Sequence, residues 1–514
     1  MRYRLAGTLL ACAIALAAPA GAGASEYLLS VMQDDNQLVY GTGAQREFAL
    51  DGMQGLGVDA VRVTVLWEVV APARKPRDTT DPRRYGAARW DRYDELVKSA
   101  ARRGMAVYFD VTAPGPRWAH ERTRDRANRR TWIPKSREWY RFIRALGKRY
   151  SGVYRDENAG RETLPRVAWW GLFNEPNQGG WLTPQAIKTK RGKVLPVSPI
   201  IYRSLMIEGA RGLISTGHAD DLVVLGETAP LGVAPQGARR PLRPALFIRE
   251  IFCLDGKLRP FRGEAARLRG CDKVKRLSVL SKLSRLTWGH HPYTKNLSPT
   301  TRHPHRDSIS MASIRRLPVL LDKIAKRTGL LPQGMPILLT EFGYETDPPD
   351  PFNGVSEKDQ AEYLNLGDYI AFKNPRVFAN TQFQLFDVPP QTQFPRNSRQ
   401  YWFTFQSGLF RADGSAKPSA HAYMMPFEVR PAGGNRHLFW GQVRFTPNGA
   451  KQTVYLQAKA PGGDWQNVGE PVSVDNHLGF WEVTRESFPG VTWRAAWVSA
   501  DGADLKLSRE ITTK

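Results

Sequence analysis

The stretch WWGLFNEP, residues 169–176, is the part of this sequence that decides the fold. A short apolar run ends there in Asn174, Glu175 and Pro176, and a second run, PILLTEFG at 336–343, ends at Glu341 in the same way. In a barrel of parallel strands, all strands end on the same rim, and the residues at these ends begin the loops that surround the barrel mouth. We therefore expect Glu175 and Glu341 to meet at the carboxyl end of one barrel.

The pattern that surrounds these two runs repeats along the chain. Short apolar runs occur at 27–32, 60–66, 106–111, 167–173, 222–226, 286–289, 337–340 and 378–386. Between them, apolar residues three to four apart predict helices at 90–103, 137–150, 199–216, 309–328 and 357–373. This alternation predicts an α/β protein with a (β/α)8 TIM barrel over 25–426. A doubly wound sheet would need a Gly-rich phosphate loop, which the sequence lacks.

The last part of the chain has a different pattern. After Pro426 the helical period disappears, and short alternating strands are expected at 436–445, 452–459, 471–474, 480–483 and 492–498. This predicts a small C-terminal β-sandwich domain over 427–514. Its tryptophans favour a role in the core over a sugar-binding platform; they are Trp440, Trp465, Trp481, Trp493 and Trp497.

The N-terminus has the composition of a signal peptide. Residues 1–24 combine Arg2 and Arg4, an apolar stretch and small residues, so we expect a secreted, extracellular protein. No later window approaches the roughly 18 apolar residues of a membrane span. Cleavage would remove Cys12 and leave Cys253 and Cys271, which predicts a disulfide in an oxidising compartment; two unpaired thiols are the alternative.

The two glutamates and their surroundings resemble those of the clan A barrel glycoside hydrolases, which include families 5 and 39. The resemblance covers most of 27–425. It implies that Glu175 is the acid/base and Glu341 the nucleophile of a retaining O-glycosyl hydrolase, and that Asn174 binds the sugar 2-hydroxyl. Two such carboxylates are what cleavage of a glycosidic bond requires, and retention needs them about 5–5.5 Å apart. No metal and no cofactor are then expected.

Further residues fit the resemblance at their places along the chain. Arg62 matches an arginine that orients the nucleophile, and His291 and Tyr293 match a His-x-Tyr motif whose tyrosine holds the nucleophile. Trp67 is a further substrate-binding candidate. Glu227 closes the fifth run and either faces substrate, pairs with Arg62 or caps a loop.

One departure from the resemblance concerns the eighth strand. Family 5 enzymes usually end it with a tryptophan that stacks on the sugar, whereas this chain reads NTQFQLFD at 380–387. Gln384 or Phe386 would have to serve instead. The sugar identity therefore cannot be taken from the cellulases.

The charge of the chain bears on its partners. The formal charge is +25, and residues 239–285 hold fourteen basic and four acidic side chains. Either these are solvated helix faces, or they attract an anionic polysaccharide or cell-wall surface. No nucleic-acid recognition motif accompanies the charge.

The expected partner is thus a polysaccharide or oligosaccharide with linkages of the β type, and the protein is expected to be a monomer. Two other functions remain open. A carbohydrate-binding protein without turnover would use the same cleft, although two mutually repelling acids argue against it. A transglycosidase would use the same residues and differ only in whether water or a sugar reaches the intermediate.

Overall fold

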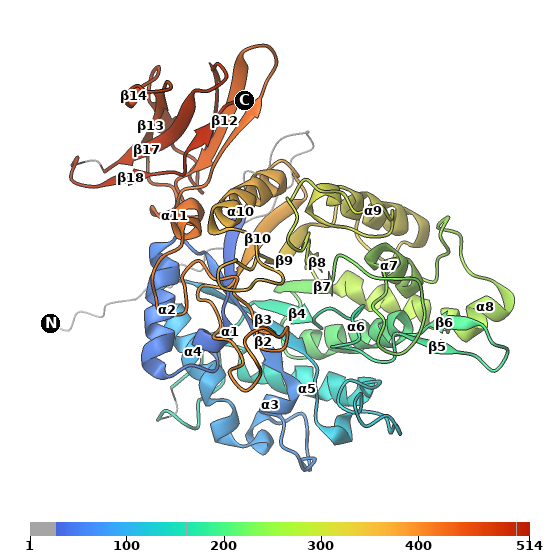
Figure 1. The fold of residues 1–514 in the computed structure, drawn as a ribbon. Helices are drawn as coiled ribbons and strands as arrows, with labels where there is room; N and C mark the ends of the chain where they lie inside the picture. Colours follow the sequence, from blue (N-terminus) through green and yellow to red (C-terminus); the bar gives the residue numbers. More distant parts are fainter. Residues whose placement is uncertain (1–26, 161, 500) are drawn as a thin grey trace.

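A computed structural model describes residues 27–160, 162–499 and 501–514 (Figure 1). The expected signal peptide lies outside these residues. Among the described helices, none has the length and apolar character needed to cross a membrane.

Eight parallel strands form a closed barrel, as the sequence predicted (Figure 1). Around the ring they follow the order β1-β10-β9-β8-β7-β4-β3-β2. Barrel strands that follow one another along the chain are therefore neighbours in the ring. Each expected apolar run became a strand, with ends that differ by up to three residues. The strands are β1 Leu29–Gln33, β2 Ala60–Leu66, β3 Ala106–Thr112, β4 Trp169–Leu172, β7 Leu222–Thr228, β8 Arg285–His290, β9 Ile337–Phe342 and β10 Val377–Phe383.

Helices follow the strands and enclose the barrel. The expected ones are α4 Asp91–Arg102, α5 Ser136–Arg149, α6 Ser198–Ile214, α9 Arg316–Thr328 and α10 Glu357–Phe372. The others are α1 Asp35–Leu38, α2 Gly43–Gly55, α3 Trp67–Val70, α7 Pro244–Ile251, α8 Gly263–Leu268 and α11 Pro418–Met424, with the 3-10 turns η1 Pro82–Tyr85, η2 Ala87–Arg89, η3 Arg117–Ala119, η4 Cys271–Lys282 and η5 Met311–Ser313. The expected start of α9 at 309 was wrong, because 311–313 form a separate turn. Helix α2 was missed, although Thr42 and Gln45 form a capping box at its start.

The barrel interior carries a polar layer near the carboxyl ends of its strands. Arg62, Asp110 and Glu227 point inward from three strands and are fully buried. Glycines make room for them: a Cβ atom on Gly171 would collide with Glu227 Oε1, and one on Gly289 would lie 2.6 Å from Glu227 Cγ. The main apolar core lies between the strands and the surrounding helices, and a smaller apolar cluster that includes Ala60, Tyr108 and Trp169 fills the barrel interior on the amino-end side of the polar layer. Within the barrel interior, these buried charges are therefore concentrated at one level, directly below the barrel mouth.

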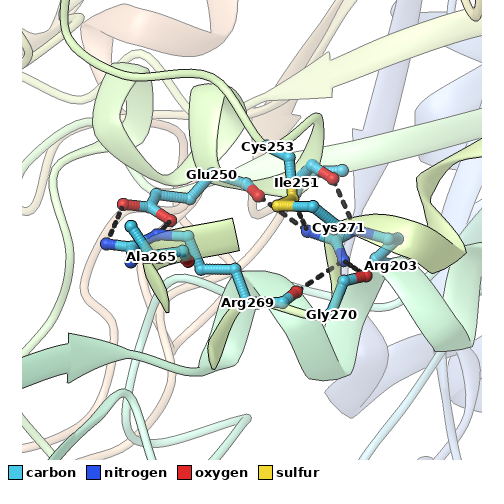
Figure 2. Close-up of a disulfide and its surroundings, with 8 residues drawn as sticks. All are labelled: Arg203, Glu250, Ile251, Cys253, Ala265, Arg269, Gly270 and Cys271. Carbon is cyan, nitrogen blue, oxygen red and sulfur yellow. Dashed lines mark hydrogen bonds and ion pairs between the residues drawn. A yellow bond between two sulfur atoms is a disulfide. The ribbon is translucent and has the colours of Figure 1, made fainter. Parts of the chain in front are cut away.

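A long insertion after β7 carries the disulfide. Cys253 and Cys271 are bonded, with their Cα atoms 5.7 Å apart, which confirms the prediction. Figure 2 shows Arg203 of α6 beside this bond. Its guanidinium donates to backbone carbonyls on both sides of the loop, at Ile251 (2.6 Å) and Arg269 (2.9 Å) among others. The disulfide and the buried arginine together hold the insertion against the outer wall of the barrel.

The C-terminal domain consists of two antiparallel sheets, consistent with the predicted sandwich. One holds β11 Phe427–Pro431, β12 Arg436–Gln442 and β16 Phe480–Glu486; the other holds β13 Gln452–Lys459, β14 Gln466–Asn467, β15 Val472–Val474, β17 Thr492–Val498, β18 Leu505–Leu507 and β19 Ile511–Thr512. A separate hairpin, β5 Ala186–Lys188 with β6 Val194–Pro196, belongs to the loop after β4. Four of the five tryptophans are buried, whereas Trp465 lies at the surface between Lys459 and Arg494.

The two domains pack directly against each other. Trp440 packs on Phe372 of α10, with ring centroids 5.4 Å apart. Arg444, which follows β12 of the C-terminal domain, forms an ion pair with Asp368 of α10 at 3.0 Å, and both side chains are buried. Figure 1 shows the sandwich above α10 and α11, away from the loops that follow β2, β3 and β4.

Candidate active site

Glu175 lies just beyond β4 on a strained piece of backbone. Its φ is +36°, a conformation that residues other than glycine rarely adopt. The backbone is held there by a hydrogen bond from Glu175 N to the carbonyl of Glu227, at 3.1 Å. Burial raises the pKa of the Glu175 carboxyl to about 7, against the opposing charge of Arg62. The group is therefore protonated in a large fraction of molecules near neutral pH.

Glu341 comes from β9 and has more polar partners than Glu175. Arg62 Nη1 donates to Glu341 Oε1 at 2.9 Å, and the Tyr293 hydroxyl donates to Oε2 at 3.2 Å. Burial raises the pKa of Glu341, while the nearby charge of Arg62 lowers it. The guanidinium and the phenol both favour the ionised carboxylate, which is the form that can act as a nucleophile.

His291 connects the two glutamates. Its Nδ1 lies 3.0 Å from Glu175 Oε1 and 3.4 Å from Glu341 Oε2. Burial lowers the pKa of His291 to about 4, so the ring is neutral at pH 7 and carries a single N–H. The structure thus brings together the two carboxylates that the sequence singled out, in contact with one imidazole nitrogen.

Arg62 is the centre of the polar layer. Its Nη2 donates to Asp110 Oδ2 at 2.9 Å and to Glu227 Oε2 at 2.7 Å, in addition to the Nη1 contact with Glu341. Glu227 thus pairs with Arg62, which was one of the three roles expected for it. Gln33 at the end of β1 also accepts from this guanidinium. One buried cation therefore faces the two fully buried carboxyl groups of Asp110 and Glu227 and the partly buried one of Glu341.

Asp110 is a site residue that the sequence reasoning missed. Burial, and next the charge of Glu227, hold its pKa well above the usual range for an aspartate. The charge of Arg62 opposes this shift in the pKa of Asp110. The signal was present in the sequence as an acid inside an otherwise apolar run, AVYFDVT at 106–112.

Asn174 precedes Glu175 and is positioned by Arg62. Its Oδ1 accepts from Arg62 Nη2 at 2.9 Å, and its backbone N donates to Thr112 Oγ1 at 3.1 Å. With the amide oxygen engaged, the amide N–H groups are the part left to donate to a ligand. This orientation suits recognition of a hydroxyl acceptor beside Glu175.

Trp67 does not fit the substrate-binding role expected for it. Trp67 is the first residue of α3, and its ring is fully buried. It stacks on Phe142, with ring centroids 5.2 Å apart and an angle of 11° between the ring planes. Trp118 and Trp139 pack against it edge-on. Since no face of the ring is exposed, Trp67 packs below the rim and presents no platform for a sugar.

The end of β10 distinguishes the two residues that were expected to replace the missing tryptophan. Phe386 packs between Phe48 and Phe410, with centroids 6.1 and 5.5 Å away, and so belongs to the wall of the barrel. Gln384 is buried, and its Oε1 has no hydrogen-bond partner among the described residues. Of the two candidates, Gln384 is the one with a free polar group.

A loop of aromatic residues follows β10 on the same rim. Within it Phe403 is 82% exposed and Phe405 is 50% exposed. The sequence signal was the cluster YWFTF at 401–405, which sequence reasoning passed over. Exposed aromatic faces at a barrel mouth are suited to stacking on sugar rings.

Comparison with known proteins finds solved structures of low similarity to this chain. The chain matches no protein-family model and no curated protein. It is similar to a family 39 glycoside hydrolase from Bacteroides cellulosilyticus WH2 (14% identity, 90% of this chain and 81% of that chain, TM-score 0.49). It is also similar to GH5_18 from Streptomyces cattleya (16%, 78% and 79%, 0.46) and to a family 1 β-glucosidase from Thermotoga maritima (13%, 74% and 86%, 0.46).

These three solved structures are clan A glycoside hydrolases, the group that the sequence resembles. At such low identities and TM-scores the likeness carries no argument about this chain. The function of this chain has to rest on its own residues.

Proposed function

We propose that this protein is a retaining glycoside hydrolase in which Glu341 is the nucleophile and Glu175 the acid/base. The observation that carries the proposal is the position of His291 Nδ1, 3.0 Å from one carboxylate and 3.4 Å from the other. The sum of these distances is an upper limit on the separation of the two oxygens. Two carboxylates this close to one nitrogen are compatible with the roughly 5–5.5 Å between the carboxyl groups of retaining enzymes.

In the first step, Glu341 attacks the anomeric carbon while Glu175 gives its proton to the leaving oxygen. The bond from the anomeric carbon to that oxygen breaks, and an ester to Glu341 forms. Arg62 and Tyr293 hold the attacking carboxylate in place through its two oxygens. Asn174 donates to the sugar 2-hydroxyl, where the interaction strengthens as positive charge develops on the ring.

In the second step, Glu175 acts as the base. Once Glu341 is esterified its charge is gone, so the pKa of Glu175 falls and the carboxylate can accept a proton from water. Water then attacks the anomeric carbon and releases Glu341 as the free carboxylate. If a sugar hydroxyl replaces water, the same residues catalyse transglycosylation.

We further propose that the protein is exported and acts on an extracellular polysaccharide or oligosaccharide. The apolar N-terminal stretch supports export, and so does the Cys253–Cys271 disulfide, since such bonds persist in oxidising compartments.

The test compares Glu341→Gln with Glu175→Ala. Glu341→Gln should lower turnover by several orders of magnitude with little change in substrate affinity, because it removes the nucleophile and keeps the size of the side chain. Glu175→Ala should still form the ester from aryl glycosides with good leaving groups, which need no proton. Azide should then speed the second step and yield a glycosyl azide of retained configuration.

Mass spectrometry detects the ester to Glu341, and NMR determines the configuration of the azide product. Equal loss of activity in both variants on activated substrates, with no azide product, would overturn the assigned roles. Wild-type protein that binds glycans but turns over no activated glycoside would indicate the alternative, a carbohydrate-binding protein.

A further inference from the structure

A cationic groove lies on the rim that is formed by the segments after β2 and β3. It has a volume of about 470 Å³. Its lining has two parts: an apolar part that includes Val69, Ala71 and Pro116, and a set of charged side chains. The charged side chains are Glu68, Arg89, Arg117, Arg129 and Arg130.

The groove shares the barrel face with the two glutamates. Glu68 and Val69 follow the carboxyl end of β2, the strand that carries Arg62, and residues 115–130 follow the carboxyl end of β3. Strand β3 pairs with β4, whose end leads directly into Glu175. Because all eight strands are parallel, their carboxyl ends open on one side, and the groove is therefore beside the active-site mouth.

The charge of the groove is largely uncompensated. Glu68 is paired with Arg130. Arg89, Arg117 and Arg129 are exposed, and none of them forms an ion pair with an acid in the described parts of the chain. The loop from 117 to 130 adds to this field, with six arginines against two acids. Three free cations around a small cleft attract and orient an anion.

A second cationic groove, on the outer wall beside α6, gives a useful contrast. It is lined by Arg211, Arg276 and Lys282. There Glu208 contacts Arg211 at 2.9 Å and Arg276 at 3.0 Å, so much of the positive charge is locally compensated. The uncompensated groove is the one on the active-site face.

We propose that the rim groove binds acidic sugar units of the substrate, so that the enzyme acts on an anionic polysaccharide that bears carboxylate or sulfate groups. The inference rests on the proposed function, because the groove is treated as an extension of the catalytic cleft. Its apolar lining suits the C–H faces of a sugar ring, and the arginines suit the acidic groups, which accept bidentate hydrogen bonds from guanidinium. A neutral glycan would leave these arginines without partners.

The test measures binding without turnover, in protein that carries Glu341→Gln. The probes are two pairs of polymers that differ chiefly in charge: carboxymethylcellulose with hydroxyethylcellulose, and polygalacturonate with its methyl ester. The variant Arg117→Gln/Arg129→Gln removes two groove charges. The matched control, Lys326→Gln/Arg327→Gln, removes two exposed charges from the last turn of α9, at the opposite end of the barrel.

We expect the groove variant to bind at least one charged polymer about tenfold more weakly than the parent, and its uncharged counterpart less than twofold more weakly. The control should change each affinity less than twofold. Equal losses in the two variants would show that only overall charge matters and would overturn the proposal, as would no loss in either. Failure of the proposed function would appear separately, in the kinetics of the Glu175 and Glu341 variants, because this assay needs no catalysis.

Discussion

The surroundings of Glu341 and Glu175 differ in a way that gives two identical side chains different chemistry. Glu341 is contacted by the guanidinium of Arg62, the hydroxyl of Tyr293 and the imidazole of His291. Glu175 shares the imidazole but has no direct ion pair with Arg62 among the described contacts. Burial raises the pKa of both, yet donors that favour the anion are concentrated on one. The hydrogen-bonding and charged partners of each glutamate, more than the strand that carries it, therefore distinguish the candidate nucleophile from the candidate acid.

The largest effect is expected from Arg62→Met, which removes the cation that distinguishes Glu341. Asp110, Glu227 and Glu341 would lose their common buried partner, at a cost of about 3–5 kcal/mol in the free energy of unfolding. The pKa of Glu341 should rise, so activity should persist only at higher pH. Urea unfolding measures the first effect and pH–rate profiles measure the second.

The control for this variant is Arg102→Met. Arg102 is exposed and pairs with Glu47 at the surface, so its loss should cost less than about 1 kcal/mol. If Arg62→Met and Arg102→Met destabilised the protein equally, Arg62 would not be the buried electrostatic centre described above.

A smaller effect is expected from Tyr293→Phe. It removes one hydrogen bond to the charged Glu341, worth about 1.5–3 kcal/mol, and leaves Glu175 unchanged. We expect kcat/KM to fall roughly 10- to 150-fold, with the alkaline limb of the pH profile in place. Tyr344→Phe is the matched control, because the Tyr344 hydroxyl pairs with Thr294 and contacts neither glutamate. Similar losses in the two variants would contradict a specific role for Tyr293.

The smallest effect is a pH dependence that belongs to Glu175 alone. Its pKa of about 7 means that the acid form declines as pH rises, so kcat/KM on substrates with poor leaving groups should be about tenfold lower at pH 8 than at its maximum. Substrates with good leaving groups need no proton from Glu175, so their glycosylation step should not slow as pH rises from 7 to 8. An identical alkaline limb for both substrate classes would remove Glu175 from the role of acid.

The same pKa has a consequence for stability. The folded-state pKa of about 7 lies above the ordinary glutamate value of 4.5, so the folded protein binds more protons between these values. The contribution of Glu175 to stability is full below pH 4.5 and is lost as pH rises through 7. The glutamine in Glu175→Gln does not titrate. The free energy of unfolding of the variant minus that of wild type, measured with urea, should therefore be larger at pH 8 than at pH 5.

Most of the fold could be predicted because its signals are local. The eight apolar runs and five of the helices are periodic patterns that the chain carries along its length, and Glu175 and Glu341 could be singled out because each follows such a run. Arg62, His291 and Tyr293 were instead identified through the family resemblance. Helix α2 escaped notice since its apolar periodicity is weak, although its cap is clear. The aromatic loop at 401–405 escaped because no local pattern separates exposed aromatics from buried ones.

The sequence alone was enough to predict the alternation of strands and helices, the one disulfide possible after the expected cleavage, and Glu175 and Glu341 as the candidate carboxylates. These follow from local periodicity and composition. The tertiary structure decided that Trp67 is buried under the rim, that Asp110 joins Arg62 and Glu227 across the barrel, and that three arginines around the rim groove stay without acid partners among the described residues. Burial and charge pairing depend on residues that are distant in sequence, so they exist only once the strands have closed into a ring.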